Sequence, residues 1–212
     1  MEFIYEAIDN GSEDVINAWC PTFCIGIRAI NWKVFESKFQ AKVLKMAGIG
    51  QAGAARIAAA QIAMAASIVA AENKQFSGSL QHSFLELCQD ANAEIRKFIL
   101  SNLRLLLEKL SAEDIDKIFL SEILGYLNDQ NDTFRHLMME LIMEFHQCFA
   151  IKNLELDFAP VFIKEFEQEC KEPENWLLNH CASIVHFFNK RGWLKEDSIS
   201  LLNTFFDVFS LL

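Results

Sequence analysis

An arginine recurs at nearly equal intervals along this chain, and the segments around its copies can be aligned with one another. The arginines are Arg56, Arg96 and Arg135, at steps of 40 and 39 residues. Each one opens a segment with the apolar spacing of an amphipathic helix, and another such segment precedes it. A period of about forty residues with two helices per period predicts a linear array of helix pairs, each packed mainly on its neighbours.

The composition favours the same fold class. Hydrophobic residues make up 52 % of the 212 residues, whereas there are only 3 Pro and 8 Gly. An all-β chain of this length would need many more turn residues. We therefore predict an all-α protein organised as an α-α superhelix.

We predict about five helix pairs and an unpaired C-terminal helix, in a single domain over residues 1–212. The pairs occupy residues 1–31, 33–72, 74–110, 112–150 and 154–191, and the last helix residues 195–212. We expect Pro21 to kink or divide the second helix of the first pair, because proline has no backbone N–H. Alanines at 55, 59, 63 and 66 form one stripe of the helix over residues 53–72, which predicts close packing by its neighbours.

The unpaired last helix ends on the largely apolar run Phe-Ser-Leu-Leu at 209–212. Terminal elements of a soluble array normally present a polar outer face. The sequence leaves three explanations open: the native chain continues, this helix docks onto another subunit, or it folds back on the array. It also leaves the oligomeric state open.

An aspartate stands six residues before two of the arginines, as Asp90 before Arg96 and as Asp129 before Arg135. In the turn of a helix pair, such a carboxylate can accept hydrogen bonds from amides at the start of the second helix. The arginine can reach the aspartate of its own or of an adjacent pair. We predict a ladder of acids and bases that sets register more than stability, since an exposed ion pair contributes about 0–1 kcal/mol. Its members are Arg56, Asp90, Arg96, Asp129 and Arg135.

Two segments carry a resemblance to a known family. Leu87–Lys97, followed by Leu103 and Leu110, resembles a HEAT repeat of the armadillo-like superfamily, and Leu127–Arg135 repeats the pattern. The resemblance covers residues 74–150, and the flanks agree in spacing only. Among HEAT proteins, these units are most similar to the scaffold (A) subunit of protein phosphatase 2A and to the large regulatory subunits of protein phosphatase 4.

The resemblance implies a non-enzymatic scaffold whose turns form a ridge that contacts other proteins, among them a Ser/Thr phosphatase catalytic subunit. The ridge would comprise residues 9–13, 48–53, 90–94, 129–133 and 171–176. Its candidate partner-binding residues are Asn92, Glu94, Asn131, Asp132 and Trp176. Trp176 has two readings, a binding anchor in a turn or the buried start of a second helix.

The sequence holds no pattern typical of a catalytic, cofactor or metal site, so we expect no enzymatic activity and no cofactor. Gly48–Gly53 fits part of a dinucleotide-binding fingerprint, but that motif follows a β-strand, and here an amphipathic helix precedes it. The five histidines lack the spacing of a structural zinc module or of a His-Glu-x-x-His helix.

The net charge of −10 argues against nucleic acid as a partner. Lysines at 33, 38, 42 and 45 form either a solvated helix face or a docking patch for an acidic partner. The six cysteines include no Cys-x-x-Cys pair, and we expect reduced thiols in a cytoplasmic or nuclear protein. Arg56 and Gln61 interrupt the Ala-rich run over residues 52–71, so we expect no membrane insertion.

Two functions follow from these observations. The first is a HEAT-repeat scaffold for protein–protein interaction, in its most specific form a phosphatase regulatory or scaffold subunit. The alternative is a helical structural subunit, or a fragment of one, inside a larger multi-protein assembly.

Overall fold

The computed structural model describes residues 1–48, 50–51, 53–171 and 175–193. Every regular element in these ranges is a helix, and each helix packs on helices near it in the sequence. The all-α class and the neighbour-to-neighbour packing of an α-α superhelix are thereby confirmed. The helix predicted over residues 195–212 lies outside the described residues.

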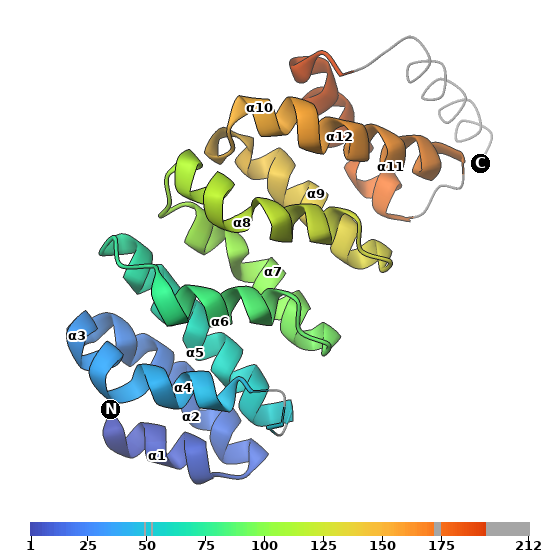
Figure 1. The fold of residues 1–212 in the computed structure, drawn as a ribbon. Coiled ribbons are helices and arrows are strands. Elements are labelled where there is room, and N and C mark those ends of the chain that lie inside the picture. The colour runs from blue at the N-terminus through green and yellow to red at the C-terminus, as the bar shows by residue number, and fades with distance from the viewer. Residues whose placement is uncertain (49, 52, 172–174, 194–212) are drawn as a thin grey trace. The chain divides into compact units, whose positions relative to one another are not determined.

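The chain divides into two compact units, Met1–Ile115 and Asp116–Leu212 (Figure 1). The single domain over residues 1–212 stays a prediction. Each unit is built from helix pairs of the predicted kind.

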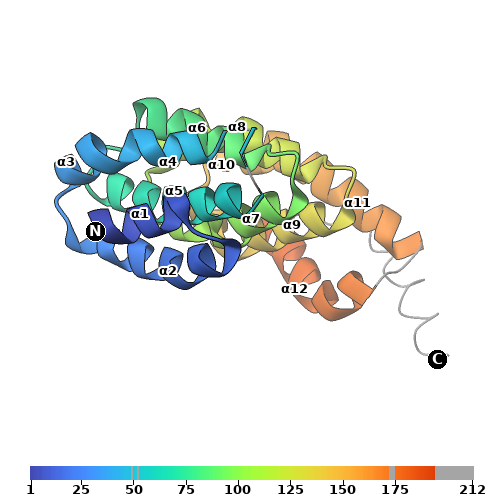
Figure 2. The ribbon, with the colours of Figure 1, turned by 90° about the horizontal axis from the view of Figure 1, so that it is seen from below.

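Unit 1 contains three helix pairs. Their elements are α1 (Glu2–Asn10), α2 (Glu13–Ala29), α3 (Trp32–Phe35), the π-helix η1 (Glu36–Gln40), α4 (Ala41–Met46), α5 (Gly53–Glu72), α6 (Gly78–Cys88) and α7 (Ala93–Leu107). Helix α5 contacts α2, α4, α6 and α7. In Figure 2, α4 and α6 lie along one side of this unit and α2 lies along the opposite margin.

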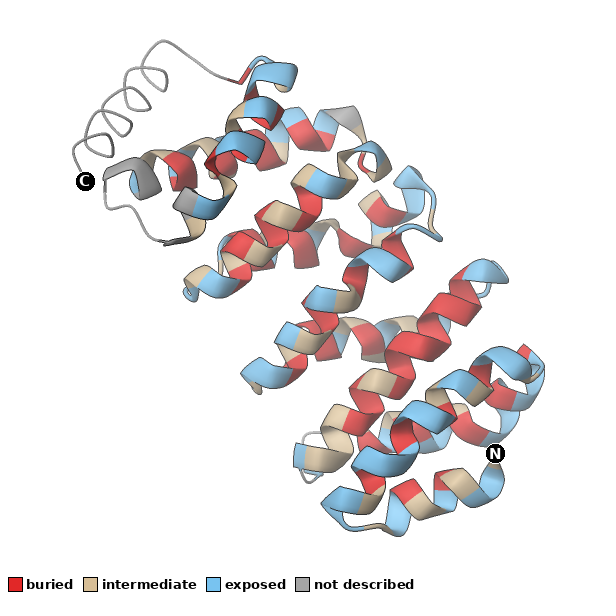
Figure 3. Ribbon diagram, turned by 180° about the vertical axis from the view of Figure 1, so that it is seen from behind, coloured by how far each residue is buried: buried red, intermediate tan, exposed pale blue. Residues whose placement is uncertain are grey.

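Helix α5 forms the centre of unit 1. Its bounds are those predicted, and Ala59, Ala63 and Ala66 on the alanine stripe are at most 1 % exposed. Figure 3 shows this helix buried over most of its length. Small side chains here let neighbouring helix backbones approach closely, so the stripe serves packing.

Of the two outcomes expected for Pro21, a kink or a division of the helix, the division does not occur. Helix α2 runs through Pro21 without interruption. Proline removes the hydrogen bond that would reach the carbonyl of Asn17, but both residues are exposed. Water can therefore satisfy that carbonyl.

Two of the predicted first helices contain a π-helical turn. In unit 1, η1 joins α3 to α4, so that residues 32–46 form one continuous helix. In unit 2, the π-helix η3 (Leu154–Phe158) joins α10 (Ile151–Asn153) to α11 (Ala159–Lys171) in the same way. A π turn adds one residue to a helical turn, and the apolar periodicity of the sequence does not predict such an insertion.

Unit 2 continues with helix pairs packed around aromatic side chains. Besides α10, η3 and α11, it holds α9 (Asp132–Phe145), the 3-10 helix η2 (His146–Cys148), α12 (Asn175–Arg191) and α8 (Ala112–Leu127) from Asp116 onward. Phe158, Phe162, Phe166 and Phe188 are completely buried. Gly192 follows α12 at φ +71°, a left-handed conformation that favours glycine at the end of a helix.

Candidate interaction site

The turn between α6 and α7 is held by two successive side chains. The Asp90 carboxylate accepts a hydrogen bond from the backbone N–H of Asn92 (2.7 Å). The Asn92 side-chain oxygen in turn accepts from the N–H of Glu94 (2.9 Å) and caps α7. The aspartate thus fixes the turn, and the asparagine caps the helix.

The turn between α8 and α9 repeats this geometry. Asp129 accepts from the N–H of Asn131 (2.8 Å), and Asn131 accepts from the N–H of Thr133 (2.9 Å). The sequence analysis predicts that the aspartates accept hydrogen bonds from amides at the start of the second helix. Each aspartate instead accepts from the N–H of the capping asparagine, which lies just before the helix. The asparagine occupies the position from which a side-chain oxygen reaches the first free helical amide.

The arginine of each pair also binds the turn through its backbone. Arg96 Nη1 donates to the carbonyl of Asp90 (2.7 Å), and Arg135 Nη1 donates to the carbonyl of Asp129 (2.8 Å). In both turns, the arginine Nη1 is therefore hydrogen-bonded to the backbone carbonyl of the aspartate six residues before it. This contact explains why arginine recurs at one position relative to the aspartate.

Two arginines reach further, to the next helix pair of their own unit. Arg56 forms an ion pair with Asp90, whose side chain is 6 % exposed. Arg135 Nε donates to Glu165 on α11 (2.8 Å), and Arg135 also pairs with Asp132. These contacts link successive pairs, as the predicted ladder requires, although the acid that Arg135 reaches is a glutamate.

Glu165 is a buried carboxylate in this linkage. Burial by itself would raise its pKa, but the His136 imidazole 3.6 Å away and the hydrogen bond from Arg135 outweigh that effect and hold the pKa below its usual value. Burial likewise opposes the charged form of Arg135, yet the hydrogen bond to Glu165 keeps the pKa of Arg135 above its usual value. The two groups stabilise each other in their ionised forms.

Trp176 begins α12 and takes part in an internal cluster. Its indole N–H donates to Glu140 (2.6 Å), and its ring stacks on His136 with centroids 4.0 Å apart. His180 stacks on the indole as well, and its Nε2 lies 3.3 Å from Glu140. The ring and the N–H of Trp176 thus make contacts inside unit 2. These contacts favour the interpretation of Trp176 as the start of a second helix over that of a binding anchor.

The sequence analysis missed this cluster. His136 follows Arg135 directly, and His180 lies one helical turn after Trp176. Forty residues of sequence separate His136 from Trp176. Only the packing of α12 on α9 brings them together. One sequence signal for the cluster was present: Trp176 and His180, four residues apart, lie on the same face of a helix.

A hollow adjoins the turn ridge in each unit. In unit 1 it measures about 590 Å³, and Arg56, Gln89 and Asp90 are among its lining residues. In unit 2 it measures about 530 Å³, lined in part by Arg135 and Gln168. The two arginines and the two glutamines are each separated by 79 residues, so the hollows occupy the same place in the repeat.

The remaining ridge candidates lie where the turns were expected. Glu94 is exposed in the first turn of α7, and Asn131 and Thr133 are exposed at the start of α9. Residues 9–13 span the exposed connection between α1 and α2. The segments 48–53 and 171–176 include positions outside the described residues.

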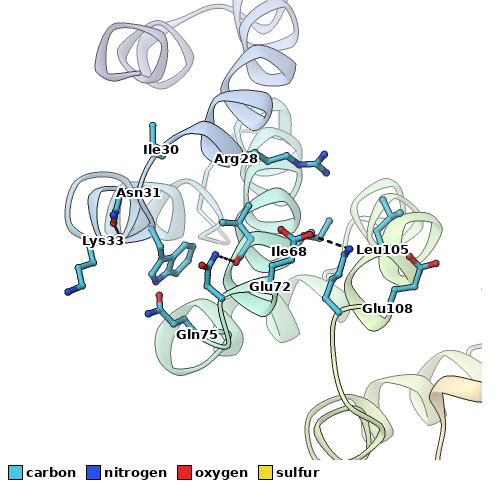
Figure 4. A pocket seen from close by; sticks show the side chains of 13 residues that line it. Arg28, Ile30, Asn31, Lys33, Ile68, Glu72, Gln75, Leu105 and Glu108 are labelled. Atoms are coloured by element: carbon cyan, nitrogen blue, oxygen red, sulfur yellow. Dashed lines mark hydrogen bonds and ion pairs between the residues drawn. The ribbon is translucent and has the colours of Figure 1, made fainter.

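A third hollow, of about 780 Å³, lies in unit 1 at the connections from one helix pair to the next (Figure 4). Arg28 reaches it from the end of α2 and Lys33 from α3. Lys109 forms an ion pair with Glu72 (3.2 Å) at its wall. Charges of both signs line this hollow, and the sequence analysis did not identify it.

Within the described ranges, no three His, Cys, Asp or Glu side chains gather as a metal site would require. Cys20, Cys24, Cys88, Cys148 and Cys181 are free thiols. Helix α5 has the length and apolarity of a membrane span, and 67 % of its apolar window is buried inside the protein. One such helix is weak evidence for a membrane, because the core helix of a soluble protein has the same composition.

The turns, the linking arginines and the neighbour-to-neighbour packing define a repeat domain, and comparison with known families identifies which one. Residues 38–211 match the family model described as PIK3R4-like, middle domain. The chain belongs to this family. The match includes 174 of the 212 residues (211 − 38 + 1) and begins within η1. A comparison with curated proteins finds no match.

The PIK3R4-like middle domain is a helical domain of a regulatory or scaffold-type subunit. The coarser part of the HEAT resemblance, a helical scaffold, therefore agrees with the family. The finer part, a relation to the scaffolds of protein phosphatases 2A and 4, has no counterpart in these comparisons.

Proposed function

We propose that this PIK3R4-like domain is a non-enzymatic scaffold that holds a protein partner along its turn ridge. The observation that carries the proposal is the repeated turn, in which Asp, Asn and Arg occupy the same positions twice and form the same hydrogen bonds. Such turns present a rigid backbone at regular intervals. A partner can therefore contact successive repeats without ordering flexible loops, which lowers the entropic cost of binding.

Exposed polar groups beside the rigid turns supply the contacts. Glu94 and Gln130 are exposed on the ridge, and each unit has a hollow next to it that a partner side chain can enter. The Asn92 and Asn131 side chains already cap helices. Among the predicted residues, Glu94 is thus the best probe of binding that leaves the turn intact.

The test is affinity purification of the full chain and of two matched variants. Glu94→Lys reverses a ridge charge at the second residue of α7. Glu113→Lys makes the same change at the second residue of α8, in the connection between helix pairs and away from the ridge. We expect a stoichiometric partner with the wild type and E113K, and at least a tenfold weaker recovery with E94K.

Equal recovery by E94K and E113K would place the interaction away from the ridge. If the wild type recovers no stoichiometric partner, the scaffold proposal fails. The alternative, a structural subunit of a larger assembly, predicts instead that the isolated chain is insoluble or aggregates.

The finer version of the proposal names a Ser/Thr phosphatase catalytic subunit as the partner. It rests on the similarity of the turns at residues 90–96 and 129–135 to those of phosphatase scaffolds. Recovery of a phosphatase catalytic subunit supports this version, and recovery of different proteins alone overturns it. We further propose a cytoplasmic or nuclear location, supported by the free thiols, which fluorescence microscopy of the tagged chain tests.

A further inference from the structure

Helix α2 turns an uncharged stripe towards solvent. The stripe is spaced by three and four residues and consists of Val15, Ala18, Thr22, Ile25 and Ala29. Val15 is half-buried, and the other four are exposed, Ile25 by 71 %. The opposite face of α2 is buried in unit 1 through Ile16, Cys20, Phe23 and Ile27.

This stripe has the composition and spacing of a helix–helix contact. Spacing by three and four residues keeps a seam of side chains on one side of a helix, where another helix can pack. Trp19 lies beside the stripe and is 39 % exposed. No residue from Val15 to Ile27 is charged. Exposed apolar side chains on an uncharged helix face suit an interaction surface.

The charges at the two ends of α2 indicate what covers the stripe. Asp14 lies at the start of the helix and Arg28 in its last turn. At 100° per residue, both fall on the same flank of the stripe. Within the described part of the chain, neither forms an ion pair, so both remain available to a partner.

We propose that this face binds the same face of a second copy of the chain, with the two α2 helices antiparallel across a two-fold axis. Thr22 lies midway between Val15 and Ala29 and faces its own counterpart. In an antiparallel pair, the same flanks of the two helices meet. Each Arg28 then lies within a turn of the other copy's Asp14. In a parallel pair, opposite flanks meet and Asp14 and Arg28 stand at opposite ends, so these charges would not pair.

The proposed contact is independent of the scaffold function and goes beyond it. Residues 15–29 precede the segment that matches the family model, and Figure 2 shows α2 along a margin of unit 1. The two turns that repeat the Asp, Asn and Arg contacts connect α6 to α7 and α8 to α9, so none of their residues belongs to the α2 stripe. A dimer would present two copies of the ridge to its partners.

Sedimentation equilibrium of the full chain over micromolar concentrations tests the proposal. We expect the wild type to form a reversible dimer and Ile25→Glu to sediment as a monomer. Arg28→Glu and Asp14→Lys should each raise the dimer dissociation constant roughly tenfold, because each substitution turns two symmetric attractions into repulsions. The double variant that carries both Arg28→Glu and Asp14→Lys restores opposite charges. Its dimer dissociation constant should return to within a few-fold of the wild-type value.

Lys33→Glu is the matched control. Lys33 is exposed and lines the same hollow as Arg28, but it lies outside the stripe, so its reversal should leave the dimer unchanged. Circular dichroism establishes that each variant is folded. A wild type that stays monomeric, an I25E variant that still dimerises, or a double reversal no better than the single ones would each overturn the proposal. Partner recovery by the ridge is measured separately and is unaffected by these outcomes.

Discussion

At the residue scale, the asparagine caps determine how firmly each ridge turn is held. Asn92 and Asn131 each supply one acceptor to the first free amide of their helix. Replacement by alanine removes this acceptor and should lower the free energy of unfolding by about 0.5–2 kcal/mol. Urea denaturation followed by circular dichroism measures the change.

Asn92→Asp is the control for this prediction, since aspartate retains the acceptor and its charge suits a helix N-terminus. A loss in N92D equal to that in N92A would show that the cap hydrogen bond is unimportant to the turn.

Also at the residue scale, Glu165 should make stability depend on pH. Its pKa in the folded protein lies below the usual value, which is about 4.3 in an unfolded chain. Its contribution is therefore fully present above the unfolded value and is lost as the pH falls through the folded value. We expect Glu165→Gln to be less stable at neutral pH and to show a flatter decline in acid.

Unfolding free energies measured from neutral pH down to the acid limb give this comparison. Glu113→Gln, which removes an exposed carboxylate, should retain the wild-type slope. The assignment to Glu165 would be wrong if E165Q and E113Q followed the same curve.

At the scale of the element, the alanine stripe of α5 requires small side chains. Ala63 is 1 % exposed at the centre of unit 1. Ala63→Leu should destabilise the protein by about 1–3 kcal/mol, because added methylenes force backbone shifts in a packed core. Ala41→Leu on α4, where the side chain is exposed, should be close to neutral. Thermal unfolding of both variants distinguishes packing from helix propensity.

The helices themselves were largely predictable, and the contacts between them were not. Apolar periodicity placed α5 at its observed bounds, and the Asp and Arg spacing located the turns. Pro21 does not divide α2 because Asn17 is exposed to water, and that exposure is a tertiary property. The stacking of His136 on Trp176 depends on how α12 packs on α9, and no local pattern encodes that packing.

At the scale of the whole molecule, the chain is a set of similar helix pairs, and two of their turns, at residues 90–96 and 129–135, are held by the same hydrogen bonds. Membership of the PIK3R4-like middle domain family agrees with a scaffold or regulatory role. The same turn chemistry recurs in unit 1 and unit 2, so a partner that recognises one turn finds a related surface at the other.

Hydrogen-exchange mass spectrometry of the chain with its affinity-purified partner tests this account most directly. We expect the partner to slow exchange in the turns at residues 89–94 and 128–133. The connections at residues 73–77 and 108–112, at the other end of the helix pairs, should exchange as in the free chain. Protection confined to those connections, or no protection in either turn, would contradict the assignment of the ridge as the binding surface.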